Sequence, residues 1–108
     1  MSIFAQERQR RADAEIEAQR QAAKRIRDEA LNAITHTFPD GSVVQVRPSD
    51  LSNFQLAIAQ GIDRKWVMED NTTRITTVGE LQAAMASGIA QGGSIWDDYI
   101  DAIDALNA

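Results

Sequence analysis

The sequence predicts an α+β protein in which a long N-terminal helix precedes a ββα-ββα body with a four-stranded antiparallel sheet. Three observations support this fold class. Residues 3–34 contain no Gly and no Pro, the residues after them change to alternating patterns broken by turn signals, and those signals recur after thirty residues. We therefore expect two parts, a coiled-coil or docking helix over residues 1–35 and a small domain over residues 36–108.

The N-terminal helix carries a stripe of small and apolar residues at alternating spacings of four and three. Ser2 is a suitable N-cap, and the helix formers Ala, Gln, Arg and Glu dominate the segment. A stripe of this kind stays aligned with a neighbouring helix, so it predicts oligomerisation or docking. The seam, as we call this stripe, consists of Ala5, Gln9, Ala12, Ile16, Gln19, Ala23, Ile26, Ala30 and Ala33.

The seam is lean, because Ala occupies most of its positions and only Ile16 and Ile26 are large. Gln9 and Gln19 add polar layers, which fix the register of a coiled coil at a cost in stability. We expect such thin packing to order the helix mainly within an assembly. The alternative is an isolated charged helix held by pairs four residues apart, such as Glu15 with Gln19.

The first half of the body has the pattern of a hairpin followed by a helix. Pro39-Asp40-Gly41 is a turn signal between two alternating segments, and Pro48 ends the second of them. Ser49 is a suitable N-cap for the helix that follows, and Gly61 is a suitable end. We expect strands over 35–38 and 42–47 and a helix over 50–60.

The second half repeats this order. Asp70-Asn71 is the turn, and Thr77 with Glu80 has the form of a capping box that starts a helix at Val78. The adjacent glycines at 92 and 93 cost about 2 kcal/mol in a helix interior relative to alanine, so we expect a kink or a short break there. The other expected elements are strands over 64–69 and 72–76, with Trp66, Met68 and Ile75 pointing inward, and a final helical segment over 95–106.

The two halves of the body match when the sequence is shifted by thirty residues. Asp40-Gly41-Ser42 then falls on Asp70-Asn71-Thr72, and Asp50-Leu51 falls on Glu80-Leu81. We therefore expect each half to be the same ββα unit, with the helices on one face of a shared sheet.

The body is acidic. The net charge of the chain is −5, and residues 30–108 hold ten Asp or Glu against four Lys or Arg. This balance disfavours nucleic acid as a partner, since such binding depends on neutralising phosphates. The chain has no Cys, no segment of membrane-spanning length, and charges from Glu7 onward in place of a signal peptide, so we expect no membrane partner and a cytosolic product.

The sequence predicts no catalytic, metal or cofactor site, and we expect the chain not to be an enzyme. His36 is the only histidine and has no nucleophile or orienting partner near it in sequence. Asp97, Asp101 and Asp104 lie on one face of the last helix, which is more typical of a solvated or partner-facing acidic surface than of a metal site. We expect both tryptophans in the core.

Several short motifs follow one another in the body. They are a Phe-x-Asp-Gly hairpin at Phe38, Trp66, the Asp70-Asn71 turn, a Thr-x-x-Glu-Leu helix start at Thr77, and the closing Trp96-Asp97-Asp98-Tyr99. In this order they resemble a family of small phage domains of unknown function that are associated with tail and tail-fibre proteins. The resemblance covers residues 37–106 and leaves the N-terminal helix outside it.

This resemblance implies a structural component of a bacteriophage virion, such as a tail, baseplate or tail-fibre-associated subunit, made in the cytoplasm of the bacterial host. Its partners would be other phage tail or tail-fibre proteins, and a homotrimer is expected by analogy with tail fibres. One alternative is a tail-fibre assembly chaperone, since Trp96 and Tyr99 resemble the ending of such chaperones. Another is an adaptor whose helix joins the helices of a different protein.

Overall fold

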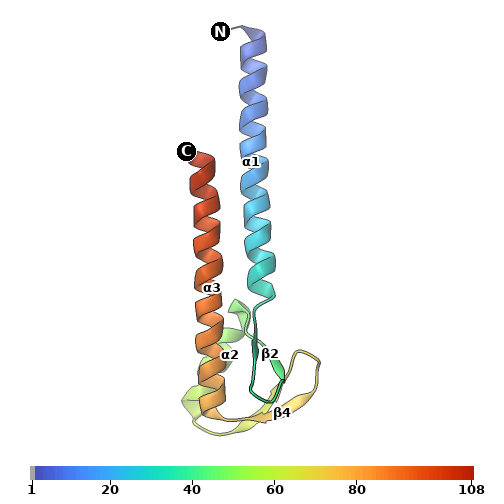
Figure 1. Cartoon of the computed structure of the whole chain (residues 1–108), viewed down its shortest axis with the longest axis vertical. Helices are drawn as coiled ribbons and strands as arrows, with labels where there is room; N and C mark the ends of the chain where they lie inside the picture. The colour runs from blue at the N-terminus through green and yellow to red at the C-terminus, as the bar shows by residue number, and fades with distance from the viewer. Residues whose placement is uncertain (1) are drawn as a thin grey trace.

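The computed structural model describes residues 2–108 and shows two long helices that run side by side from a small body (Figure 1). The molecule is elongated, with extents of 70 × 23 × 21 Å. The N-terminal end of the first helix extends beyond the end of the last one (Figure 1). The elements are α1 (Ile3–Asn32), β1 (Thr35–Thr37), β2 (Val43–Gln45), the 3-10 turn η1 (Pro48–Asp50), α2 (Leu51–Gln60), β3 (Arg64–Val67), β4 (Thr73–Thr76) and α3 (Val78–Asn107).

α1 begins and ends close to the expected residues. The Ser2 Oγ accepts a hydrogen bond from the Ala5 backbone N–H at 3.2 Å, which confirms Ser2 as the N-cap. None of the residues from Ile3 to Asn32 is fully buried. Packing contributes to α1 mainly where α3 lies against it, so the rest of the helix depends on the propensity of its residues.

Two antiparallel hairpins build the body, and their turns are held in the same way. β1 pairs with β2, and β3 pairs with β4. In the first turn the Asp40 Oδ1 accepts a hydrogen bond from the Ser42 N–H at 2.9 Å. In the second the Asp70 Oδ1 accepts one from the Thr72 N–H at 3.0 Å. The thirty-residue repeat is therefore confirmed in the hydrogen bonding of both turns.

The expected four-stranded sheet is wrong, because the hairpins form two separate two-stranded sheets. Within residues 2–108 one backbone hydrogen bond joins them, from the Glu69 N–H to the Val43 carbonyl at 2.8 Å. Both hairpins direct buried residues such as Val44 and Met68 into one core. This shared core holds the hairpins together without further strand pairing, and Ile75, which was expected to point inward, is 61% exposed.

The core lies where the hairpins meet α2 and the first turns of α3. Phe54 of α2 and Leu81 of α3 are fully enclosed, and burying a side chain of this size contributes about 1.5–3 kcal/mol. Trp66 is half-buried and packs on Phe54 at the edge of the core, with ring centroids 4.9 Å apart, so its expected place in the core is confirmed in part. α2 ends at Gly61, whose φ of +69° is the left-handed conformation that favours glycine at a helix end.

α3 is one continuous helix, so the expected break at Gly92 and Gly93 is wrong. Its start is confirmed: the Glu80 N–H donates to the Thr77 Oγ1 at 3.1 Å, and the Thr77 N–H donates to the Glu80 Oε1 at 3.0 Å. Packing against α1 offsets the cost of the glycines. A Cβ at Gly92 would lie 4.0 Å from the Leu31 side chain, at ordinary contact distance from α1.

Candidate functional site

α1 and α3 form an antiparallel helix pair, which we call the arm (Figure 1). Near its free end the Arg20 Nη2 donates a hydrogen bond to the Asn107 Oδ1 at 3.2 Å. Residues 3–18 of α1 continue beyond this contact, and we call them the overhang. The arm is therefore a two-helix unit next to the body and a single helix at its tip.

Arg27 joins the two helices of the arm. Its guanidinium lies over the rings of Trp96 and Tyr99, 4.8 and 4.5 Å from their centroids, and donates a hydrogen bond to the Asp28 Oδ1 at 2.9 Å. The two rings meet edge to face, with centroids 5.6 Å apart. Each cation–π contact of this kind contributes about 0.5–1 kcal/mol at an exposed site. Trp96 is 45% exposed on the surface of the arm, so the expectation that it lies in the core is wrong.

A groove of about 340 Å³ runs between α1 and α3. Its walls are almost entirely apolar, and Ile26 on one wall is 65% exposed. A contiguous apolar surface of this kind is typical of a protein–protein contact site. The groove is lined by Gln19, Ala22, Ala23, Ile26, Arg27 and Ala30 from α1 and by Ile95, Asp98, Tyr99, Ala102 and Leu106 from α3.

The structure divides the predicted seam between two surfaces. One group lies on the overhang, a second group lines the groove together with α3, and the last residue is the C-cap of α1. The overhang therefore continues the small and apolar surface of the groove along α1. In order, these groups are Ala5, Gln9, Ala12 and Ile16; then Gln19, Ala23, Ile26 and Ala30; and finally Ala33.

The contribution of α3 to the groove was not predicted from the sequence. Ile95, Tyr99, Ala102 and Leu106 follow the same alternating spacings of four and three as the seam. This second stripe was the available signal that α3 would lie along another helix. It was missed because Trp96, which lies beside this stripe, was expected to face the core.

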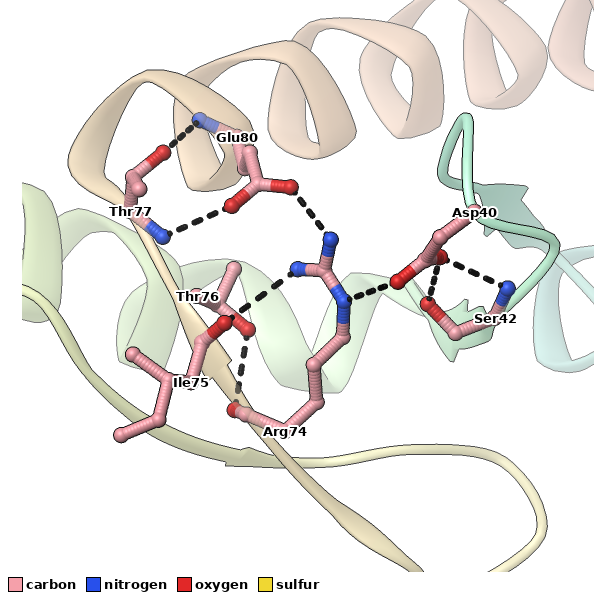
Figure 2. Close-up of polar contacts among 7 residues, drawn as sticks. All are labelled: Asp40, Ser42, Arg74, Ile75, Thr76, Thr77 and Glu80. Carbon is pink, nitrogen blue, oxygen red and sulfur yellow. Dashed lines mark hydrogen bonds and ion pairs between the residues drawn. The ribbon is translucent and has the colours of Figure 1, made fainter.

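Arg74 of β4 connects both hairpins to the start of α3 (Figure 2). Its Nε donates to the Asp40 Oδ2 at 2.8 Å, and its Nη2 donates to the Glu80 Oε2 at 2.5 Å. Hydrogen bonds from the Ser42 hydroxyl and from Arg74 hold the pKa of Asp40 below its ordinary value, and Arg74 also lowers the pKa of Glu80. Each charged group of this cluster has a partner. The cluster therefore fits a structural link and offers no free base for catalysis.

Outside the arm, the described part of the chain offers little chemistry. Within residues 2–108 no group of three or more His, Asp or Glu side chains lies close enough to hold a metal ion, and no helix has the length and apolar character to cross a membrane. His36 lies edge to face with Phe38, with ring centroids 5.2 Å apart. No family model, curated protein or solved structure matches the chain. The arm is therefore the feature from which we infer a function.

Proposed function

We propose that the chain is a non-enzymatic structural subunit that docks into a larger assembly through its arm, as a tail, baseplate or tail-fibre-associated component of a bacteriophage virion. The exposed apolar groove, continued by the overhang, is the observation that supports docking. The phage setting is supported by the resemblance of the motifs in the body. The partners are then other tail or tail-fibre proteins, and the location is the virion.

The overhang gives a physical reason for a partner. An isolated helix shorter than about 12–15 residues is marginal in water, and longer ones gain most of their stability from packing. Residues 3–18 extend beyond α3, and their two largest apolar side chains at the tip, Ile3 and Phe4, are 65% and 74% exposed. A neighbour that covers this surface stabilises both the helix and the assembly.

An assembly chaperone or adaptor that leaves before the particle is complete is the second candidate. The lean seam favours it, because layers built from alanine bury little area and allow release. Mass spectrometry of purified particles separates the two candidates. A structural subunit is retained at a fixed copy number, whereas a chaperone is absent from finished particles.

The docking role is tested by placing carboxylates on the seam. We expect Ile16→Asp with Ile26→Asp to lower incorporation into particles at least about tenfold, since an unpaired buried charge costs several kcal/mol. Ala14→Asp with Ala18→Asp is the matched control, because it adds two carboxylates at exposed positions of α1 away from the seam. Circular dichroism shows whether both variants keep their helices. Incorporation of the seam variant at the level of the control would rule out docking through the arm.

A further inference from the structure

The charges of α1 are ordered in blocks of alternating sign. Residues 8–11 hold three Arg, 13–17 hold three Asp or Glu, 20–27 hold four Lys or Arg, and 28–29 hold two more acidic residues. A parallel, in-register neighbour places each block beside a block of the same sign. An antiparallel neighbour centred on residue 19 places 8–11 beside 27–30 and 13–17 beside 21–25. Arg10 then faces Asp28, while Arg11 faces Arg27, the one like-charged pair of the contact. Charge order therefore favours the antiparallel arrangement.

Side-chain volumes at the two large seam residues follow the same symmetry. With residue 19 at the centre, Ala12 faces Ile26 of a second copy, and Ile16 faces Ala22, which lines the groove of that copy beside the seam. Each large side chain then meets a small one, which gives even packing along the contact. In a parallel, in-register pair each Ile faces Ile and each Ala faces Ala, so layers of large side-chain volume alternate with layers of small volume. Gln19 meets its own copy at the centre, where a polar layer fixes the register.

α3 completes this contact surface. Asp98 lines the groove, and its neighbour Tyr99 lies against Arg27, so Asp98 is near the level of Arg27 along the arm. In an antiparallel pair centred on residue 19, position 27 faces position 11 of the second copy. Arg11 on one overhang is thereby brought to the level of both Arg27 and Asp98 of the other copy, where Arg27 is already bound to Asp28 and Asp98 can neutralise Arg11. Within residues 2–108 Asp98 has no ion pair of its own.

We propose that two copies of the chain form a two-fold symmetric antiparallel dimer in which each overhang fills the groove of the other copy. This inference rests on the proposed docking function and names a second copy as the first partner. The body lies at one end of the arm (Figure 1), so the two bodies lie at opposite ends of the dimer and do not collide. The contact uses the same surface of both copies and closes on itself.

Cysteine cross-linking tests the orientation, because the chain has no Cys of its own. A mixture of Ala12→Cys and Ile26→Cys should form a disulfide between the two variants, which requires Cα atoms about 4.4–6.8 Å apart. Neither variant alone should cross-link, since positions 12 and 26 are separated by about 21 Å along a helix. Gln19→Cys is the control that cross-links in either orientation.

The mixed cross-link without self cross-links supports the antiparallel dimer. Self cross-linking of Ala12→Cys would overturn the antiparallel dimer and favour a parallel assembly. The trimer expected from the phage resemblance is one such assembly. A chain that sediments at 11.9 kDa and does not cross-link through Gln19→Cys overturns the dimer altogether. If that monomer is retained in purified particles, the proposed docking function still holds without the dimer. If the chain is a dimer in solution but is absent from particles, the dimer is supported and the proposed virion function is wrong.

Discussion

Gly88 sets the distance between α3 and the first hairpin. A Cβ at this position would lie 2.2 Å from the Val46 Cγ1, 2.9 Å from the Val46 Cβ and 3.2 Å from the Val46 carbonyl oxygen. Either the helix or the hairpin would have to move. We expect Gly88→Ala to lower the free energy of unfolding by about 1–3 kcal/mol, although alanine is the better helix former. Urea denaturation followed by circular dichroism measures this change.

Gly93, one turn and a residue further along α3, provides the matched control. A Cβ at this position would point into open space, so Gly93→Ala should raise the free energy of unfolding by up to about 1 kcal/mol. The two substitutions add the same methyl group to the same helix. A stabilising effect at both positions would mean that α3 does not approach Val46 as closely as the structure indicates.

Most features that depend on residues close together in the sequence were predicted correctly. The Ser49 N-cap is wrong, because Ser49 lies inside the 3-10 turn η1 and Asp50, the residue before α2, makes no side-chain cap. Ser2 caps α1 through Ala5, and Thr77 pairs with Glu80 at the start of α3. In each case the two partners are three residues apart, so the sequence contains the whole interaction. Gly88 was not predicted to matter, because its role depends on Val46 in a distant part of the chain.

At the scale of elements, Arg74 links β4 to the first turn and to α3. The pKa values of Asp40 and Glu80 are lowered in the folded state. Their contribution to stability is therefore complete above their unfolded values, near pH 4, and is lost as the pH falls through the lower folded values. We expect Arg74→Met to lower the melting temperature at neutral pH and to flatten its decrease in acid. Thermal melts between about pH 2 and 7 measure both effects.

Lys65→Met is the control for this prediction. Lys65 is an exposed cation of the same hairpin and has no ion pair within residues 2–108, so its removal should change neither the neutral melting temperature nor the acid profile. If the melting temperatures of Arg74→Met and the wild type decrease in parallel from neutral to acid pH, the carboxylates are not stabilised by Arg74.

Both ββα units were predicted from the sequence, but their arrangement was not. The turns at Asp40 and Asp70 and the glycine at the end of α2 are local signals. Whether two hairpins share a sheet depends on contacts between distant residues, and within residues 2–108 the bond from Glu69 to Val43 is the one backbone hydrogen bond between the hairpins. The continuity of α3 through its glycines has the same explanation, since it depends on packing against α1.

At the scale of the whole molecule, the seam predicted that α1 packs against another helix, and α3 packs against part of α1. Periodicity identifies an apolar stripe but does not identify the helix that covers it. The stripe formed by Ile95, Tyr99, Ala102 and Leu106 was therefore as informative as the seam. The overhang carries the seam residues that α3 does not contact, and these residues are the reason to expect a partner.

Pairing through charged blocks makes the proposed dimer sensitive to ionic strength. Raising the salt concentration from 0.15 M to 1 M shortens the Debye length from about 8 Å to about 3 Å. The attraction between residues 8–11 and residues 28–29 is weakened accordingly. We expect the dissociation constant to rise about tenfold, which corresponds to about 1.4 kcal/mol spread over several exposed pairs. Sedimentation equilibrium in sodium chloride measures this constant without the strong apolar stabilisation that sulfate adds.

The direction of the salt effect separates the two orientations of α1. In a parallel assembly the blocks repel one another, so added chloride should strengthen association by screening that repulsion. A variant with Arg8→Glu, Arg10→Glu and Arg11→Glu provides the internal comparison, because residues 8–11 then carry the same sign as residues 28–29. This variant should associate more weakly than the wild type at low salt and lose less affinity as salt is added, because the pairing of residues 13–17 with 21–25 remains. If association of the wild type becomes tighter as salt is added, its blocks repel one another and the antiparallel pairing is wrong.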